Sequence, residues 1–320
     1  MSRVLGELEK RLATLRQQGR DRESEPLLRQ VVRLTCRQYG ANHAMHAARL
    51  NDLGGLYRTT GRYAESEACF VQARGILLTT VGENDPDYAT CLNNLAGLYR
   101  LTGEHARSEG LFLAADAIYA RTLGERHFFY ASNLNNVALL YQDMGRYEEA
   151  IRLQKRAIDL VGSISGDDAP SYATSLCNLA ATCMTTGDLE TAEALIGRAI
   201  TILRAATTPD DVRHLSTLNA MASLRCRQER HAEALALYEQ VLGICSGRWG
   251  TEHPAYASTL ISLGVVHAAT GKREEALRCY GEALAIRRRI LGDDHPVTRD
   301  AQAAFAAISG QPADRTSVEP

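Results

Sequence analysis

The chain has 320 residues, of which 45% are hydrophobic and 23% charged, and its formal net charge is −2. This near-neutral charge provides no overall basic field, so it gives no reason to expect nucleic acid or an anionic membrane as a partner. The charged N-terminal stretch lacks the apolar core of a signal peptide, and no apolar run approaches the roughly 20 residues of a membrane span. The 8 cysteines follow no disulfide or zinc spacing, so we expect reduced thiols in a cytoplasmic protein.

Helical patterns follow one another along the chain and return every 42 residues, the spacing from Gly61 to Gly103. One glycine column has Glu229 as its exception and contains Gly61, Gly103, Gly145, Gly187 and Gly271. A second is interrupted at Thr208 and contains Gly40, Gly82, Gly124, Gly166, Gly250 and Gly292. A leucine column contains Leu50, Leu92, Leu134, Leu176, Leu218 and Leu260. Columns that stay in step over so many periods predict a repeat architecture.

Each repeat contains two segments with apolar residues at helical spacing. The first kind is represented by residues 88–103, where Leu92, Leu95 and Tyr99 share one face, and the second kind by residues 146–162. A glycine such as Gly103 ends the first helix because it adopts positive φ at little cost. Since neither helix can bury its apolar face alone, the pattern predicts an all-α fold of stacked helix pairs.

Four segments follow in chain order. Residues 1–42 are predicted to form a degenerate N-terminal capping repeat, and residues 43–292 six repeats of 42 residues. Residues 293–308 are predicted to form a C-terminal capping helix, and the polar segment 309–320 a disordered tail. The fifth full repeat has Arg225 in the tyrosine column and Glu229 in the glycine column, so we expect local distortion there.

The linker "GTEHPAYA" at residues 250–257 resembles the corner of a catalytic or metal site. In the other repeats, however, the position of His253 is taken by His43, Asp85, His127, Ala169, Asp211 and His295. A ligand or catalytic residue would not vary among His, Asp and Ala, whereas a helix N-cap can do so. The proline that follows in most repeats suits the first helical turn. We therefore interpret this position as an N-cap.

These columns resemble the tetratricopeptide repeat, and the 42-residue period with helices such as "LNNLAGLY" is similar to the repeats of kinesin light chains. The resemblance covers about residues 43–308. It implies a right-handed α-solenoid of antiparallel helix pairs, in which the first helix of each repeat lines a concave groove. Repeats of this kind are interaction modules, so the resemblance implies a protein or peptide partner.

The resemblance also implies which columns face the groove, and from these we take a set of candidate peptide-binding residues: Asn51, Arg58, Thr90, Asn93, Arg100, Ser132, Asn135, Gln142 and Asn219. The asparagines would form a ladder of carboxamides able to pair with an extended peptide backbone. Arg16, Arg58 and Arg100 would form a basic strip beside them. Gly55 and Gly97 would leave room for a bulky side chain. An acidic peptide with an aromatic anchor fits such a groove. The alternative is that these arginines are solvated and ion-paired on an exposed face.

The sequence therefore predicts a scaffold or adaptor that binds a peptide or partner protein in the groove. Two further functions are considered beside it. One is a regulatory subunit that senses a peptide by changing the pitch of its superhelix. The other is an enzyme, which we do not expect, because the sequence has no phosphate loop, no HExxH and no G-x-S-x-G. Cys177 and Cys226 share no column with a histidine, and His43 with His46 are too few ligands for a metal. We therefore predict no catalytic residue, metal or cofactor; the sequence leaves the oligomeric state open.

Overall fold

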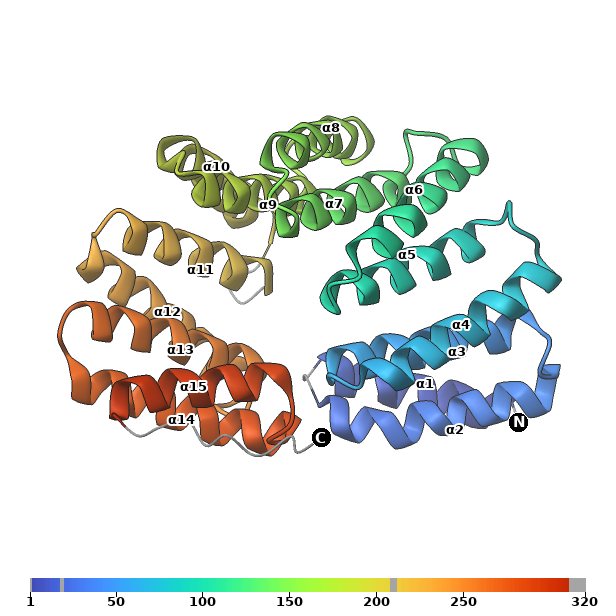
Figure 1. Ribbon diagram of the computed structural model, residues 1–320, viewed down its shortest axis with the longest axis horizontal. Helices are drawn as coiled ribbons and strands as arrows, with labels where there is room; N and C mark the ends of the chain where they lie inside the picture. The colour runs from blue at the N-terminus through green and yellow to red at the C-terminus, as the bar shows by residue number, and fades with distance from the viewer. Residues whose placement is uncertain (1, 18–19, 208–211, 311–320) are drawn as a thin grey trace. The chain divides into compact units, whose positions relative to one another are not determined.

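A computed structural model describes residues 2–17, 20–207 and 212–310. These residues form fifteen α-helices in chain order (Figure 1): α1 (Ser2–Gln17), α2 (Asp21–Tyr39), α3 (Ala44–Thr59), α4 (Tyr63–Thr80), α5 (Pro86–Leu101), α6 (His105–Thr122), α7 (Phe128–Asp143), α8 (Tyr147–Ser165), α9 (Pro170–Thr186), α10 (Leu189–Ala206), α11 (Val212–Arg227), α12 (His231–Trp249), α13 (Pro254–Ala269), α14 (Arg273–Leu291) and α15 (Pro296–Ser309). The predicted all-α class is confirmed. Most of the predicted tail, residues 311–320, lies outside the described residues.

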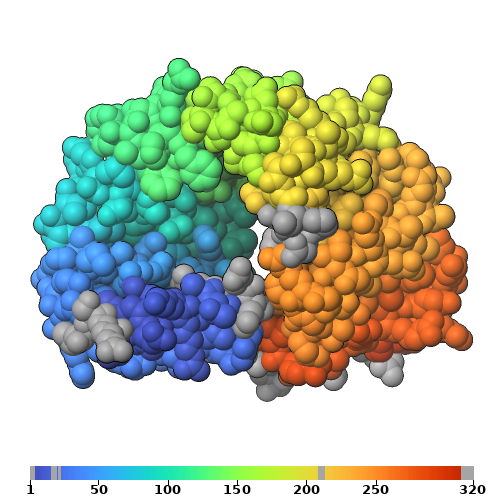
Figure 2. Space-filling view, turned by 180° about the vertical axis from the view of Figure 1, so that it is seen from behind, coloured from blue at the N-terminus to red at the C-terminus, as the bar shows by residue number. Residues whose placement is uncertain are grey.

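The chain divides into two compact units, Met1–Thr208 with α1–α10 and Pro209–Pro320 with α11–α15. Consecutive helices pack as pairs within each unit, as the stacked-pair prediction requires. In the first unit α3, α5, α7 and α9 also contact one another in sequence; we call these helices the inner layer and α2, α4, α6, α8 and α10 the outer layer. In the second unit α11 and α13 contact each other in the same way. Figure 2 shows the surfaces of these helices from behind.

From the pair of α3 and α4 onward, the turn inside each pair is built on one residue with positive φ. Gly103 has φ 80°, and the amide N–H of Glu104 donates to the carbonyl of Tyr99 at 2.8 Å, which closes the end of α5. Glu229, the exception in this glycine column, has φ 60°, and the amide N–H of Arg230 donates to the carbonyl of Arg225 at 2.8 Å. The distortion predicted for this repeat therefore does not change the path of this turn. The turn keeps its geometry and places a side chain in a strained conformation instead.

The cores lie between the helices of a pair and between neighbouring pairs. Phe70 and Phe112 are 0% and 1% exposed and occupy one column of the repeat. Small residues such as Ala96 and Ala115, both 0% exposed, let the helices approach closely. The column of Phe70 and Phe112 also contains Gln154, which is 1% exposed and forms hydrogen bonds with the carbonyl of Asn178 and the hydroxyl of Thr182. Hydrogen bonds thereby compensate the buried amide where the two preceding repeats have a phenylalanine ring.

The predicted N-caps are confirmed wherever the column is described and carries a suitable side chain. The His253 Nδ1 accepts a hydrogen bond from the amide of Ala255 at 3.1 Å, and Asp85 accepts one from the amide of Asp87 at 2.8 Å. His43, His127 and His295 cap α3, α7 and α15 in the same way. Ala169 makes no side-chain cap, and Asp211 lies outside the described residues. The linker histidines therefore begin helices.

Candidate functional site

The second asparagine of each "NN" pair connects its repeat to the preceding one across the inner layer. Asn94 on α5 donates from its side-chain amide to the Asn51 carboxamide oxygen on α3 at 3.1 Å. Asn136 on α7 donates in the same way to Asn93 on α5 at 2.9 Å. The oxygens of Asn51 and Asn93 thus already accept one hydrogen bond each, whereas their amide groups donate none within the described part of the chain. The side chains of Asn51 and Asn93 thus help to hold neighbouring repeats together.

A polar cavity of about 260 Å³ lies at the inner layer beside these asparagines. Its lining comes from α3, α5, α6 and α7 and consists of Arg58, Asn93, Asn94, Gly97, Arg100, Leu101, Phe112 and Asn136. Three of the candidate peptide-binding residues therefore meet in one cavity. Sequence reasoning placed Asn94 and Asn136 at a structural position of the repeat, and their spacing of 42 residues was the signal that they recur.

Arg58 crosses from α3 to α5 and lies against Gly97. A side chain at Gly97 would place its Cβ 2.7 Å from the Arg58 Nη1, so any larger residue there would displace the guanidinium from its present position. The same nitrogen donates to the carbonyl of Asn94 at 3.4 Å. The expectation that Gly97 leaves room for a ligand side chain is therefore wrong, because Arg58 fills that room. Gly55 does leave open space, with no atom within 4 Å of a Cβ built there.

The two arginines of the cavity differ in their partners. Arg100 forms an ion pair with Asp143 on α7 at 2.6 Å, a partner that sequence reasoning missed because aspartate is not repeated in that column. Among the described residues, Arg58 has no carboxylate within ion-pair distance. Burial lowers the pKa of the Arg58 guanidinium, and the neighbouring charge of Arg100 lowers it further. A half-buried cation beside a second cation creates a local preference for an anion. The side chain of Arg16 lies outside the described part.

The remaining candidate residues are distributed over both units. The Thr90 hydroxyl pairs with the Tyr119 hydroxyl at 2.9 Å, and Ser132 is half-buried on α7. Asn135 donates to the carbonyl of Ala131 at 3.4 Å, and its own oxygen is buried with no partner among the described residues. Gln142 donates to Thr182 on α9, which engages its amide inside the repeat stack. Asn219 lies on α11 in the second unit, whereas the other eight are in the first.

The thiols offer no chemistry at this site. Burial raises the pKa of Cys226 and raises that of Cys91 to about 12, which keeps these thiols protonated and unreactive at neutral pH. No group of three or more His, Cys, Asp or Glu that could hold a metal occurs among the described residues. Nor does any helix in the described ranges have the length and apolarity needed to cross a membrane.

Comparison with known families gives one match, a model described as the tetratricopeptide repeat. It matches residues 11–79, 48–121, 129–205, 213–289 and 263–311, which together span most of the chain. Comparison with curated protein sequences gave no match.

Three solved structures illustrate the likeness in fold. A putative kinesin light chain with nearly identical repeats from Podospora anserina is 24% identical, with a TM-score of 0.52, and the match covers 64% of this chain and 96% of that one. BtubC (BKLC) from P. vanneervenii is 21% identical, with a TM-score of 0.55, covering 82% and 97%. The Cut9–Hcn1 hetero-tetramer of the APC/C is 13% identical, with a TM-score of 0.57, covering 93% and 48%. At these identities the matches show the fold alone.

Proposed function

Because the chain belongs to the tetratricopeptide repeat family, whose members are generally protein-interaction scaffolds and typically non-catalytic, we propose that it binds an acidic peptide segment of a partner along the inner layer of the first unit. One carboxylate of the ligand enters the cavity of Arg58 and Arg100. The free amide groups of Asn51 and Asn93 donate to carbonyls of the ligand backbone. An aromatic anchor of the ligand lies over Gly55, where the helix surface is open.

The observation that carries this proposal is the unpaired guanidinium of Arg58. An arginine at this depth without a carboxylate has an unfavourable electrostatic environment in the free protein. A ligand carboxylate would supply the missing charge and form a charge-assisted hydrogen bond in a partly dehydrated cavity. This argues against the alternative of a solvated, fully ion-paired arginine strip for Arg58, although Arg100 fits that alternative through Asp143.

The proposal is tested with labelled peptides of defined composition. Each peptide carries one tryptophan flanked by Asp and Glu, by Asn and Gln, or by Lys, and binding is measured by fluorescence anisotropy on the full chain. We expect saturable binding of the acidic peptide only. Arg58→Glu should weaken it by roughly 100-fold, because truncating or reversing one member of a buried charge pair costs about 2–5 kcal/mol. Arg33→Glu, on the exposed face of α2, is the matched control and should bind as the wild type does.

A second variant tests the position of the anchor. Gly55→Leu should stabilise α3 slightly, because glycine is a poor helix former, and should still weaken the tryptophan peptide by covering its contact surface. An acidic peptide that binds equally well to wild type and to Arg58→Glu would refute the site. An equally tight Asn/Gln peptide would refute the acidic ligand. The peptide-sensing alternative remains a prediction that no observation here favours.

A further inference from the structure

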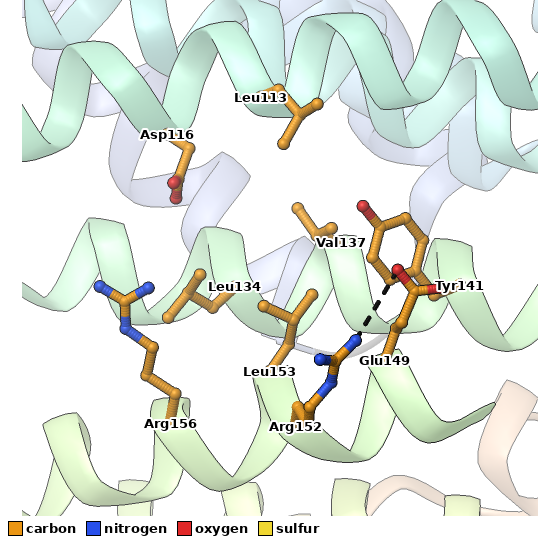
Figure 3. A pocket seen from close by; sticks show the side chains of 9 residues that line it. All are labelled: Leu113, Asp116, Leu134, Val137, Tyr141, Glu149, Arg152, Leu153 and Arg156. Atoms are coloured by element: carbon orange, nitrogen blue, oxygen red, sulfur yellow. Dashed lines mark ion pairs between the residues drawn. The ribbon is translucent and has the colours of Figure 1, made fainter. Parts of the chain in front are cut away.

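A second cavity lies on the opposite layer of the first unit, between the outer helices α6 and α8. It has a volume of about 370 Å³, and α7 forms its floor (Figure 3). Its size is at the lower end of ligand pockets in proteins, which suits one or two side chains rather than a whole cofactor. None of the candidate peptide-binding residues lines it.

Apolar side chains form the floor and both walls of this outer cleft. Leu134 and Val137 on α7 are each 3% exposed and form the floor, while Leu153 lines the α8 side. Leu113 on α6 is 50% exposed at the rim, with its side chain directed toward the cleft (Figure 3). A large apolar side chain placed here would bury the exposed part of Leu113, which contributes favourable free energy to binding.

The charges around the cleft are paired with one exception. Arg146 pairs with Glu149 at 2.6 Å, Arg156 pairs with Glu125 at 2.9 Å, and Arg152 lies 3.9 Å from Glu149. Asp116 on α6 faces Arg156 across the cleft in Figure 3, but among the described residues it forms no ion pair.

Asp116 is bound only by the side-chain amide of Asn133, at 3.1 Å. Burial raises the pKa of the Asp116 carboxyl, and the hydrogen bond from Asn133 and the charge of Arg156 across the cleft offset this only in part.

This arrangement belongs to one cleft and not to the repeat. One period earlier and one period later, the position of Asp116 is occupied by Arg74 and Ile158. The position of Leu113 is likewise occupied by Val71 and Lys155. The combination of an exposed leucine and an unpaired acid is therefore specific to the cleft between α6 and α8, and the repeat architecture does not require it.

We propose that this outer cleft binds a partner segment in which a bulky apolar side chain stands next to a lysine or arginine. The apolar side chain fills the space above Leu134 and Val137, and the cation pairs with Asp116. An anionic ligand fits less well, because Arg156 already pairs with Glu125 at 2.9 Å and the charge of Arg152, which is 75% exposed, is screened by water, whereas Asp116 is half-buried and forms no ion pair among the described residues. This site is independent of the inner groove.

The test uses three capped dipeptides that differ in one side chain: acetyl-Phe-Lys-amide, acetyl-Phe-Gln-amide and acetyl-Phe-Glu-amide. Binding to the full chain is followed by NMR of leucine and valine methyl groups. We expect the lysine probe to shift the methyl signals of Leu113, Val137 and Leu153 and to bind about tenfold more tightly than the glutamate probe, as one charge-assisted bond allows.

Two variants separate the charge from the apolar contact. Asp116→Asn keeps an acceptor for Asn133 and should abolish the preference for lysine while leaving weak binding of all three probes. Leu113→Asp should abolish binding of all three. Arg58→Glu should change none of these results, which distinguishes this site from the inner groove. Equal binding of the lysine and glutamate probes, or no saturable shift at the cleft methyls, would overturn the proposal.

Discussion

The repeat formed by α5 and α6 and the repeat formed by α11 and α12 make the same turn between their helices but carry different side chains around it. In the first, the turn is made by Gly103, and the Arg107 guanidinium lies 3.9 Å from the centre of the Tyr99 ring. In the second, Glu229 makes the same turn, and Arg225 replaces the tyrosine and pairs with Glu233 at 3.2 Å. The position of Arg100 is occupied by Cys226.

This comparison separates the residues that specify the fold from those that specify binding. The columns shared by the two repeats are buried: Ala96 and Phe112 in one correspond to Ala222 and Tyr238 in the other. The columns that differ include the turn position of Gly103 and Glu229, the inner-face position of Arg100 and Cys226, and the position of the buried Tyr99 and of Arg225. Stacking therefore tolerates wide variation on the inner face, and each repeat can present a different chemistry on the same support.

The largest expected effect comes from the shared columns. Phe112→Ala and Tyr238→Ala should each lower the free energy of unfolding of their own unit by about 3–5 kcal/mol, because each leaves a cavity in a packed core. Leu113→Ala, next in sequence but 50% exposed, is the control and should cost less than about 1 kcal/mol. Chemical denaturation with a fluorescent probe in each unit measures both. If only one of the two alanine variants lowers the free energy of unfolding by this amount, the cores at Phe112 and Tyr238 are not equivalent.

A smaller effect is expected at the turn. Glu229→Gly should raise the free energy of unfolding by about 1 kcal/mol, because it removes a side chain from the left-handed region. Gly103→Ala should lower the free energy of unfolding by a similar amount, because it introduces the same strain. Glu229→Gln, which removes the charge and keeps the strain, should leave stability unchanged. If that variant stabilises as much as glycine does, the cost at Glu229 is electrostatic and the comparison of backbones fails.

The smallest effect concerns pH and the two kinds of cap, Asp85 at the start of α5 and His253 at the start of α13. Burial lowers the pKa of His253, whose ring stacks on Trp249 with centroids 4.4 Å apart. The unfolded chain therefore binds the proton more readily than the folded one does. The contribution of His253 to the free energy of unfolding is fully present above the ordinary histidine pKa of 6.5 and is lost as the pH falls through the lowered folded-state pKa. Protonation also removes the Nδ1 acceptor, so the loss should be about 0.5–1 kcal/mol, the contribution of an N-cap.

His253→Asp is the matched variant for this prediction, since an aspartate there would cap α13 as Asp85 caps α5. Urea unfolding at pH 7.5 and pH 5.5 should show a smaller difference in the variant than in the wild type. Equal differences in both proteins would mean that other groups cause the pH dependence.

The sequence was sufficient for the helix pairs, the glycine turns and the caps, because each depends on residues close together in the chain. It was not sufficient for the contacts between repeats. The 42-residue spacing placed Arg58 and Gly97 near each other. Whether the space beside Gly97 is open or occupied depends on the path of the Arg58 side chain, which the spacing does not define. The pairing of Arg100 with Asp143 and the bond from Gln142 to Thr182 likewise depend on the distance between helices in neighbouring repeats. The division of the chain near Thr208 was not predicted either.

The reach of Arg58 across to Gly97 has a consequence for how such a chain can change its length. The fold is modular, so deleting residues 61–102 would remove one period and still join helices of the right kind. That deletion would place Leu139 where Gly97 now receives the guanidinium, because Leu139 is the next member of that column. The Arg58 guanidinium would then lose its space on α5, and the cavity that it lines would change shape. Repeats can thus be gained or lost as structural units. The polar cavity lined by Arg58 and Arg100, however, persists only if the repeats on both sides of it are retained.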